Sequence, residues 1–176
     1  MVLPFTSVHV YHKLKFTKPT NTTHTEHLTL DAIYVRPRHK TKKGTVIPAR
    51  FDTALVNVGS GGETGMEGYR IGQIRVIFSL PGDNATSPPE RLAYVEWFSD
   101  FSNPESNHKM HKVKHSVRNG ERVVSVIPVS SIRRSVHLFP RFGRVVPEDW
   151  TSDNVLEKCN TFYLNPFVDR NMYFII

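Results

Sequence analysis

The chain has 176 residues, of which 39% are hydrophobic and 22% are charged, so it can bury a core and is not a disordered polymer. This length fits one domain, or one domain with a short appendage. The formal net charge of +7 favours polyanionic partners, such as nucleic acid or acidic protein surfaces, because a positive field raises their encounter rate. A single cysteine, Cys159, excludes an intramolecular disulfide and zinc motifs that need several cysteines.

Targeting signals are not found in the sequence. The segment MVLPFTSVHVYHKLKF lacks the charged stretch followed by an apolar stretch that makes a signal peptide. No apolar run approaches the ~20 residues that a membrane helix needs. We therefore expect a nuclear or cytoplasmic protein that is not secreted and has no membrane partner.

Strand patterns dominate the first half of the chain. Residues 8–16 alternate between apolar and polar side chains with one lapse, at His12, and residues 27–35 are rich in strand-forming residues. Residues 70–80 predict a third strand with an apolar core face. The residues expected on that face are Gly72, Ile74, Val76, Phe78 and Leu80.

Residues 92–98 (LAYVEWF) are apolar on both faces, as expected for the central strand of a sheet. A further strand is predicted at 123–132, where Pro128 indicates an edge or a bulge. Between the two, the Asn119-Gly120 pair predicts a tight hairpin turn. Loops are predicted at 59–68, 81–90 and 103–108.

A helical pattern occurs only at residues 151–162. Ser152 or Asp153 could cap this helix, and Val155, Leu156, Cys159 and Phe162 recur at helical spacing. Short strands at nearly regular spacing favour a mainly β barrel or sandwich with one small helix. We expect one β-rich domain over residues 1–176, with its core at about 5–145 and a C-terminal helix and tail at 146–176.

Catalytic motifs are not apparent. His108, His111 and His115 would share one face of a helix and could hold a metal, but the hairpin pattern that follows favours a strand, on which they cannot chelate one ion. Scattered acids such as Asp31 and Asp52, with Asp100, could gather into a magnesium site, although spacing alone does not show it. We expect no enzyme activity, no metal site and no cofactor.

Basic residues give the stronger signal. Residues 36–43 (RPRHKTKK) hold five cations and no acid, a composition that can neutralise phosphates; a solvated hairpin tip is the alternative. The five are Arg36, Arg38, Lys40, Lys42 and Lys43. A second group interleaves arginines with aromatic rings, which suits phosphate contact and base stacking but equally fits core aromatics beside surface arginines. Its members are Arg133, Arg134, His137, Phe139, Arg141, Phe142 and Arg144.

An aromatic cage is a further candidate site. On a strand, Tyr94, Glu96 and Phe98 face one way, and two rings that flank a carboxylate can hold a methylated ammonium. Ordinary core packing is the alternative interpretation of this run.

Several segments, in their order along the chain, carry a resemblance to a known family: LPFTSVHVYHKLKF, IPARFDTALVNVG, GYRIGQIRVIFSLP, LAYVEWFSDF, IPVSSIRRSVHLFPRFG and WTSDNVLEKCNTFYLNPFVD. Together they resemble a domain of unknown function near the C-terminal end of fungal transposon proteins of the Plavaka type, which are similar to CACTA transposons. The resemblance spans roughly residues 3–175. It implies that the chain is a detached tail of a longer transposase-like protein, and it assigns no catalytic or binding role to any residue.

The core of the chain, roughly residues 69–142, is also similar to the bromo-adjacent homology domain of chromatin proteins. The likeness rests on GQIRVIF, YVEWF and IPVSSIRRSVHLFP, whereas DFSNPES stands where that family has a stretch like R-P-E-D-T. It implies a single partly open β-barrel of the bromo-adjacent homology or SH3-like kind, with a helix near 152–162.

These observations lead us to expect a non-catalytic nucleic-acid-binding or chromatin-binding module of a transposon protein. Its partner would be DNA, with a histone tail or a transposase subunit as further candidates, and the sequence leaves the oligomeric state open. The alternative is a protein-interaction domain that docks on a transposase core through exposed aromatics such as Trp150 and Phe167.

Overall fold

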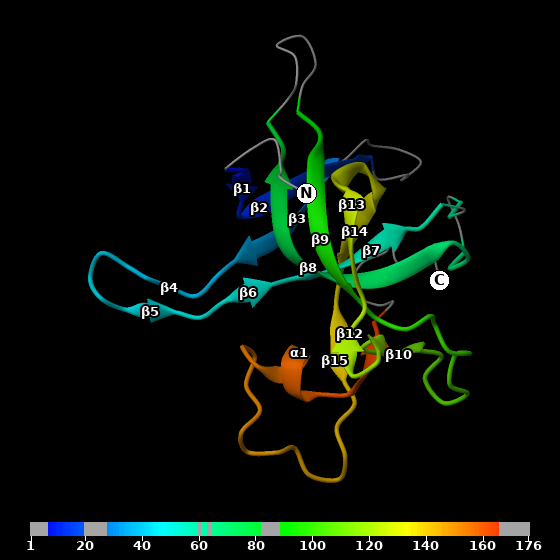
Figure 1. Cartoon of the computed structure of the whole chain (residues 1–176). Helices are drawn as coiled ribbons and strands as arrows, with labels where there is room; N and C mark the ends of the chain where they lie inside the picture. The colour runs from blue at the N-terminus through cyan, green and yellow to red at the C-terminus, as the bar shows by residue number, and fades with distance from the viewer. Residues whose placement is uncertain (1–6, 20–27, 60, 63–64, 82–88, 166–176) are drawn as a thin grey trace.

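The longest strands pair into one antiparallel sheet, the main sheet, in the computed structural model, which describes residues 7–19, 28–59, 61–62, 65–81 and 89–165 (Figure 1). Five strands follow one another across it in the order β13-β9-β8-β7-β14, and β1 (His9–Tyr11) pairs with the far end of β8. The five are β7 (Thr53–Asn57), β8 (Tyr69–Ser79), β9 (Arg91–Trp97), β13 (Val124–Pro128) and β14 (Ile132–Val136).

Strand β8 changes the face that it buries halfway along its length. Its register against β9 shifts between Ile74 and Val76, which marks a β-bulge. Beyond the bulge Ile77 and Ser79 are buried, whereas Phe78 is only half-buried. The prediction that alternate residues from 72 to 80 form one core face is therefore wrong beyond Ile74, because a bulge inserts one extra residue and reverses the alternation.

Gly72 allows β8 and β9 to lie close together. A Cβ at this position would be 2.2 Å from Cγ1 of Val95 and 3.5 Å from the ring of Trp97. Any larger residue would therefore clash with the side chain of Val95 and force it, or the strand that carries it, to move.

A second layer covers part of the main sheet. Strands β2 (Lys13–Pro19) and β3 (Leu28–Arg36) form a long antiparallel pair, and the end of β3 pairs with β6 (Arg50–Phe51). The predicted strand at 8–16 is thus divided between β1 and β2. The break lies at His12, whose backbone oxygen accepts a hydrogen bond of 3.0 Å from the amide of Val35.

A small sheet lies below the main sheet in Figure 1 and consists of β10, β16 and β15. Its strands are β10 (Lys112–Lys114), β15 (Leu138–Pro140) and β16 (Thr161–Leu164). The predicted Asn119-Gly120 turn is confirmed: it joins β11 (Val117–Arg118) to β12 (Glu121–Arg122), with φ of 53° and 84° at its two central residues.

The helix is shorter than the sequence predicts. Helix α1 covers only Val155–Lys158, and a single 3-10 turn, η1 (Val129–Ser131), joins β13 to β14. The chain becomes extended at Cys159, with φ −78° and ψ 134°, and Phe162 lies in β16, where it pairs with Val113 of β10. The prediction of a helix over 151–162 is therefore wrong at both ends, because strand pairing takes the place of the second helical turn.

Two hydrophobic cores lie on either side of the main sheet. The first core lies against the small sheet and consists of Leu55, Tyr69, Ile71, Phe98, Val113, Val136, Leu138, Cys159, Phe162 and Leu164. The second core is closed by β3 and consists of Ile33, Val35, Ala54, Val56, Ile74, Ile77, Ala93, Val95, Trp97 and Ile132. Burial of Cys159 agrees with its predicted place in an apolar stripe.

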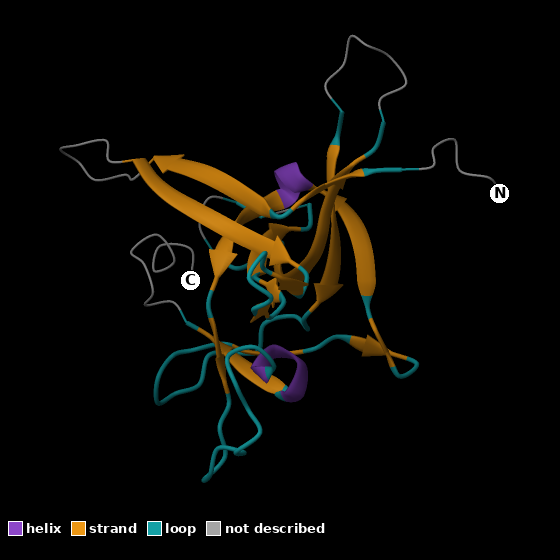
Figure 2. Cartoon of the chain, turned by 90° about the vertical axis from the view of Figure 1, so that its left-hand side faces the viewer, coloured by secondary structure: helices purple, strands orange, loops and turns teal. Residues whose placement is uncertain are grey.

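The chain is therefore mainly β with one short α-helix, as the sequence predicts (Figure 2). No sheet closes into a barrel among the residues described. In the same part of the chain, the helices fall well short of the length and apolar character required to span a bilayer.

Candidate nucleic-acid interface

The predicted basic segment lies on a projecting hairpin, which we call the basic arm (residues 36–50; left side of Figure 1). The arm begins at the end of β3 and ends at β6, and both of these strands belong to the second layer. Within it, β4 (His39–Lys40) pairs with β5 (Val46–Ile47), and Thr41 donates its amide to the oxygen of Thr45 at 2.9 Å. Gly44 allows the turn between the two strands, because its φ of 81° is one that other residues rarely adopt, and its amide donates a hydrogen bond of 2.9 Å to the oxygen of Thr41.

The cations of the arm are exposed and uncompensated. Arg36, Arg38, Lys40, Lys42 and Lys43 are all exposed, and none of them takes part in an ion pair within the described part of the chain. No acid occurs between residues 32 and 51. The first acid beyond the arm, Asp52, is bound by Arg50, with a distance of 2.8 Å between Nε and Oδ1. The arm thus presents five positive charges to solvent, and none of the five is taken up by an ion pair among the described residues.

The two arginines predicted to aid the arm have different environments. Arg133 is exposed, but the side chain of its neighbour Arg134 is buried, with the residue only 3% exposed. Burial lowers the pKa of Arg134, and the charge of Asp31 opposes that shift. Arg134 is therefore not available to a phosphate on the surface, which contradicts its predicted nucleic-acid contact. Alternation along β14 places the two neighbours on opposite faces.

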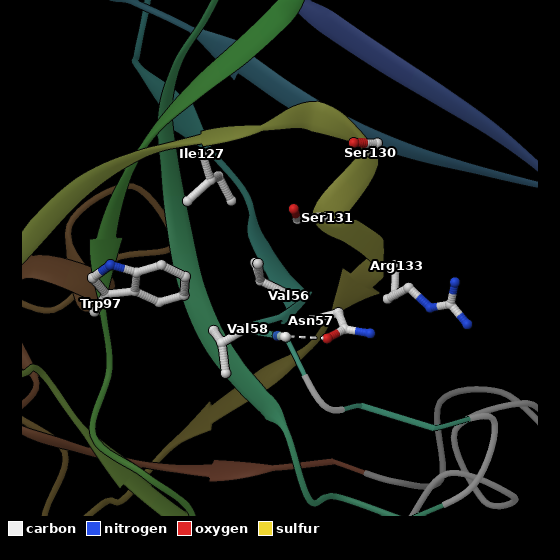
Figure 3. A pocket seen from close by; sticks show the side chains of 9 residues that line it. Val56, Asn57, Val58, Trp97, Ile127, Ser130, Ser131 and Arg133 are labelled. Carbon is white, nitrogen blue, oxygen red and sulfur yellow. Dashed lines mark hydrogen bonds between the residues drawn. The ribbon is translucent and has the colours of Figure 1, made fainter.

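Arg133 lies at the rim of a hollow of about 560 Å³ (Figure 3). Val56, Trp97 and Ile127 give this hollow apolar walls, and the guanidinium of Arg133 extends away from the indole ring. Asn57, also on its wall, is held by the loop after β7, since its Oδ1 accepts a hydrogen bond of 2.8 Å from the amide of Gly59.

The other members of the second basic group lie in the segment after β15. Arg141 and Arg144 are exposed, as are the rings of Phe139 and Phe142. Phe142 contacts Trp150 at a centroid distance of 6.1 Å. His137 packs edge-on against Phe139 at 5.6 Å. None of these residues lines the hollow beside Arg133.

The three candidate cage residues do not form an open cage. Phe98 is fully buried in the first core, where its ring stacks on His115 at a centroid distance of 4.6 Å. Glu96 already binds two guanidinium groups, while Tyr94 is half-buried on the same strand. The geometry corresponds to the ordinary packing that the sequence also allowed.

Glu96 belongs to a ring of four alternating charges, which we call the ion ring. Glu96 binds Nε of Arg75 at 3.3 Å and Nη1 of Arg122 at 3.1 Å. Glu157 binds Nη1 of Arg75 at 2.7 Å and Nη2 of Arg122 at 2.8 Å. The ion ring links β8, β9, β12 and α1, and sequence reasoning missed it because its members lie up to 82 positions apart.

His115 is held beside the ion ring. Its Nε2 lies 2.7 Å from the oxygen of Leu156, and its Nδ1 lies 3.0 Å from Nη1 of Arg122. Because the guanidinium can only donate, Nδ1 accepts and Nε2 carries the proton of a neutral ring. Burial, followed by the charge of Arg122, lowers the pKa of His115.

The remaining histidines and acids are engaged separately. His108 pairs with Glu105 at 3.0 Å, and Nδ1 of His111 lies 2.7 Å from the oxygen of Ser102. Asp31 accepts the hydroxyl of Ser135 at 2.6 Å. Asp100 pairs with Arg70, on a different strand from the Asp52–Arg50 pair. No group of three or more potential metal ligands occurs in the regions that the structure describes.

Of the sites considered above, the basic arm is therefore the one with the most exposed cations outside ion pairs. Comparisons of the chain with models of protein families, with curated proteins and with solved structures find no match.

Proposed function

We propose that the chain is a non-catalytic module that binds nucleic acid, with DNA or chromatin as its target, by neutralising phosphates along the basic arm. The observation that carries the proposal is the presence of five exposed, unpaired cations on one projecting hairpin. Each neutralised phosphate releases condensed counterions, and this release supplies the binding free energy without any sequence preference.

The shape of the arm supports a duplex as target. A two-stranded β-ribbon fits the major groove of B-DNA, which is about 12 Å wide. The pairing of β4 with β5 makes the tip of the arm such a ribbon. Arg133, which is exposed on β14, is a candidate for a sixth phosphate contact.

Five phosphate contacts set a measurable salt dependence. The logarithm of the binding constant should fall with the logarithm of salt concentration with a slope of about −4.5, at about 0.9 per phosphate. Between 50 and 200 mM salt, affinity should fall about 500-fold.

The test replaces Lys40, Lys42 and Lys43 with glutamine and measures duplex binding by fluorescence anisotropy at several salt concentrations. The slope should become shallower by about 2.7. The matched control replaces three exposed lysines elsewhere, Lys15, Lys109 and Lys114, so that the net charge changes equally. An unchanged slope in the arm variant, or equal changes in both variants, would refute the role of the arm.

We further propose that β7, β8, β9, β13 and β14 form a partly open barrel of the SH3-like or bromo-adjacent homology kind. The two outer strands of this path, β13 and β14, are consecutive in the chain, and the single turn η1 joins them, which supports the proposal. The further proposal that the chain derives from a fungal Plavaka-type transposon protein, acting in the nucleus or cytoplasm, is supported by the order of the segments quoted above.

A protein-interaction role is the second candidate, and an exposed apolar segment favours it. Val145 is 80% exposed, and Val146, Phe139 and Phe142 are also exposed on the same stretch of chain. Trp150 is half-buried against the first core, and Phe167 lies outside the described residues. Replacing Val145 and Val146 with aspartate should abolish association with a transposase core and leave duplex binding unchanged; loss of duplex binding instead would argue against this role.

A further inference from the structure

A second hollow, which we call the arm-base hollow, lies where the basic arm meets the body of the protein. Its volume is about 730 Å³. Its walls come from the end of β3, from β5 and β6, from β8 and from α1 with the residues just before it. The residues that matter for its chemistry are Tyr34, Arg36, Arg50, Phe51, Gln73 and Arg75.

Gln73 lines this hollow and carries an unsatisfied acceptor. The residue is 2% exposed, and its Nε2 donates to the backbone oxygen of Phe51 at 3.3 Å. Its Oε1 is buried and has no hydrogen-bond partner within the described regions. Buried polar atoms are nearly always paired, so this oxygen has the capacity to accept one further hydrogen bond from a donor that reaches it.

Arg50 presents a flat, fixed surface to the same hollow. One side of its guanidinium lies over the ring of Tyr34, at 4.2 Å from the centroid. Two hydrogen bonds to Asp52, of 2.8 and 3.2 Å, hold the plane in position. The side chain is nevertheless 61% exposed. A planar guanidinium of this kind stacks well on a nucleobase.

The charges within the hollow are largely balanced. Asp52 is paired with Arg50, and Glu157 is paired with Arg75. The remaining pair of opposite charges is Arg36 and Asp153, both exposed. This balance favours an uncharged planar group inside the hollow over a phosphate or an ammonium, while Arg36 belongs to both the hollow and the arm.

We infer that the arm-base hollow takes one unpaired base of a nucleic acid bound along the arm. The base stacks on Arg50, its exocyclic amino group donates to Oε1 of Gln73, and its phosphate contacts Arg36. This inference rests on the proposed function, because the arm delivers the strand to the hollow. It adds a recognition site for unpaired bases, such as those of bulges or of strands opened during transposition.

The experiment uses the whole chain and three duplexes that differ at a single bulged nucleotide, which carries adenine, unsubstituted purine or no base. Affinities are measured by fluorescence anisotropy at one salt concentration. The duplex with the adenine bulge should bind about 2- to 12-fold more tightly than the duplex with the purine bulge, because purine lacks the amino group. Purine should bind about 5-fold or more tightly than the abasic bulge, because only purine can stack.

Two conservative variants assign each difference to its residue. Gln73→Met keeps the length of the side chain and should remove the preference for adenine over purine. Arg50→Lys keeps the charge but loses the plane, and it should reduce the preference for purine over the abasic bulge. Lys40→Gln is the matched arm control and should weaken binding to all three duplexes equally.

The outcomes separate this inference from the proposed function. Equal affinity of the wild-type chain for all three bulges overturns the inference even if a variant fails to fold, and it leaves the arm intact when Lys40→Gln still weakens binding. Base preferences that survive in both folded variants also overturn it. Failure to bind any of the duplexes overturns the proposed function together with the inference.

Discussion

The ion ring should make a measurable contribution to stability, and Glu96→Gln tests it. The Glu96 side chain is 16% exposed, forms ion pairs with two arginines that are about a quarter exposed, and accepts a hydrogen bond from one of them, Arg122. Removing one partner of a fully buried ion pair costs about 3–5 kcal/mol, whereas hydrogen bonds to charged groups contribute about 1.5–3 kcal/mol. Because solvent reaches part of the ring, we expect a loss of about 2 kcal/mol in the free energy of unfolding.

Urea unfolding followed by tryptophan fluorescence measures this loss. With a slope of about 2 kcal/mol per molar urea, the midpoint should fall by about 1 M. The control is Glu148→Gln, which removes an exposed carboxylate and should change stability by less than about 0.5 kcal/mol. If Glu96→Gln behaves like this control, the four charges do not fasten α1 and β12 to the main sheet.

Two further predictions concern the first core and its border. Folding lowers the pKa of His115, so below about pH 6.5 the unfolded chain binds a proton at this histidine more readily than the folded chain. The free energy of unfolding should therefore decrease as the pH is lowered through that range. Unfolding free energies at pH 7.5 and 5.5 should therefore differ less in His115→Gln than in the wild type; an equal difference would contradict this. Phe162→Ala should cost about 3–5 kcal/mol in urea unfolding, since the ring is fully buried against Phe98 and His115, and a loss below about 2 kcal/mol would mean that the site collapses freely.

Local signals explain which parts of the fold the sequence predicts well. The Asn119-Gly120 turn and the central strand at 92–98 depend on neighbouring residues, and the structure confirms both. The sequence pattern does not predict strand β7 (Thr53–Asn57), although four of its five residues are buried. Its five residues follow a turn-rich stretch and are buried on both faces, so they lack the alternation that marks a strand.

Contacts between residues far apart in the sequence explain where the sequence-based predictions are wrong. The bulge in β8 and the early end of α1 arise from pairing with β9 and β10, which no local pattern encodes. At the candidate interface, the cations of the arm follow from composition alone. The burial of Arg134 depends instead on which face β14 turns inward, and Gln73 becomes notable only when its oxygen is found without a donor.

Two consecutive rings lie where strand β9 ends: Trp97, its last residue, belongs to the second core, and Phe98, the next residue, belongs to the first. A deletion of one residue just before this pair would reverse the faces on which the two rings lie. The indole would then point toward His115 in the first core, and the benzyl group toward Val95 in the second. Neither side could absorb the swap alone, because each core is packed by a different set of residues around its own ring. Insertions should therefore be tolerated in the outlying hairpins and rejected throughout this strand.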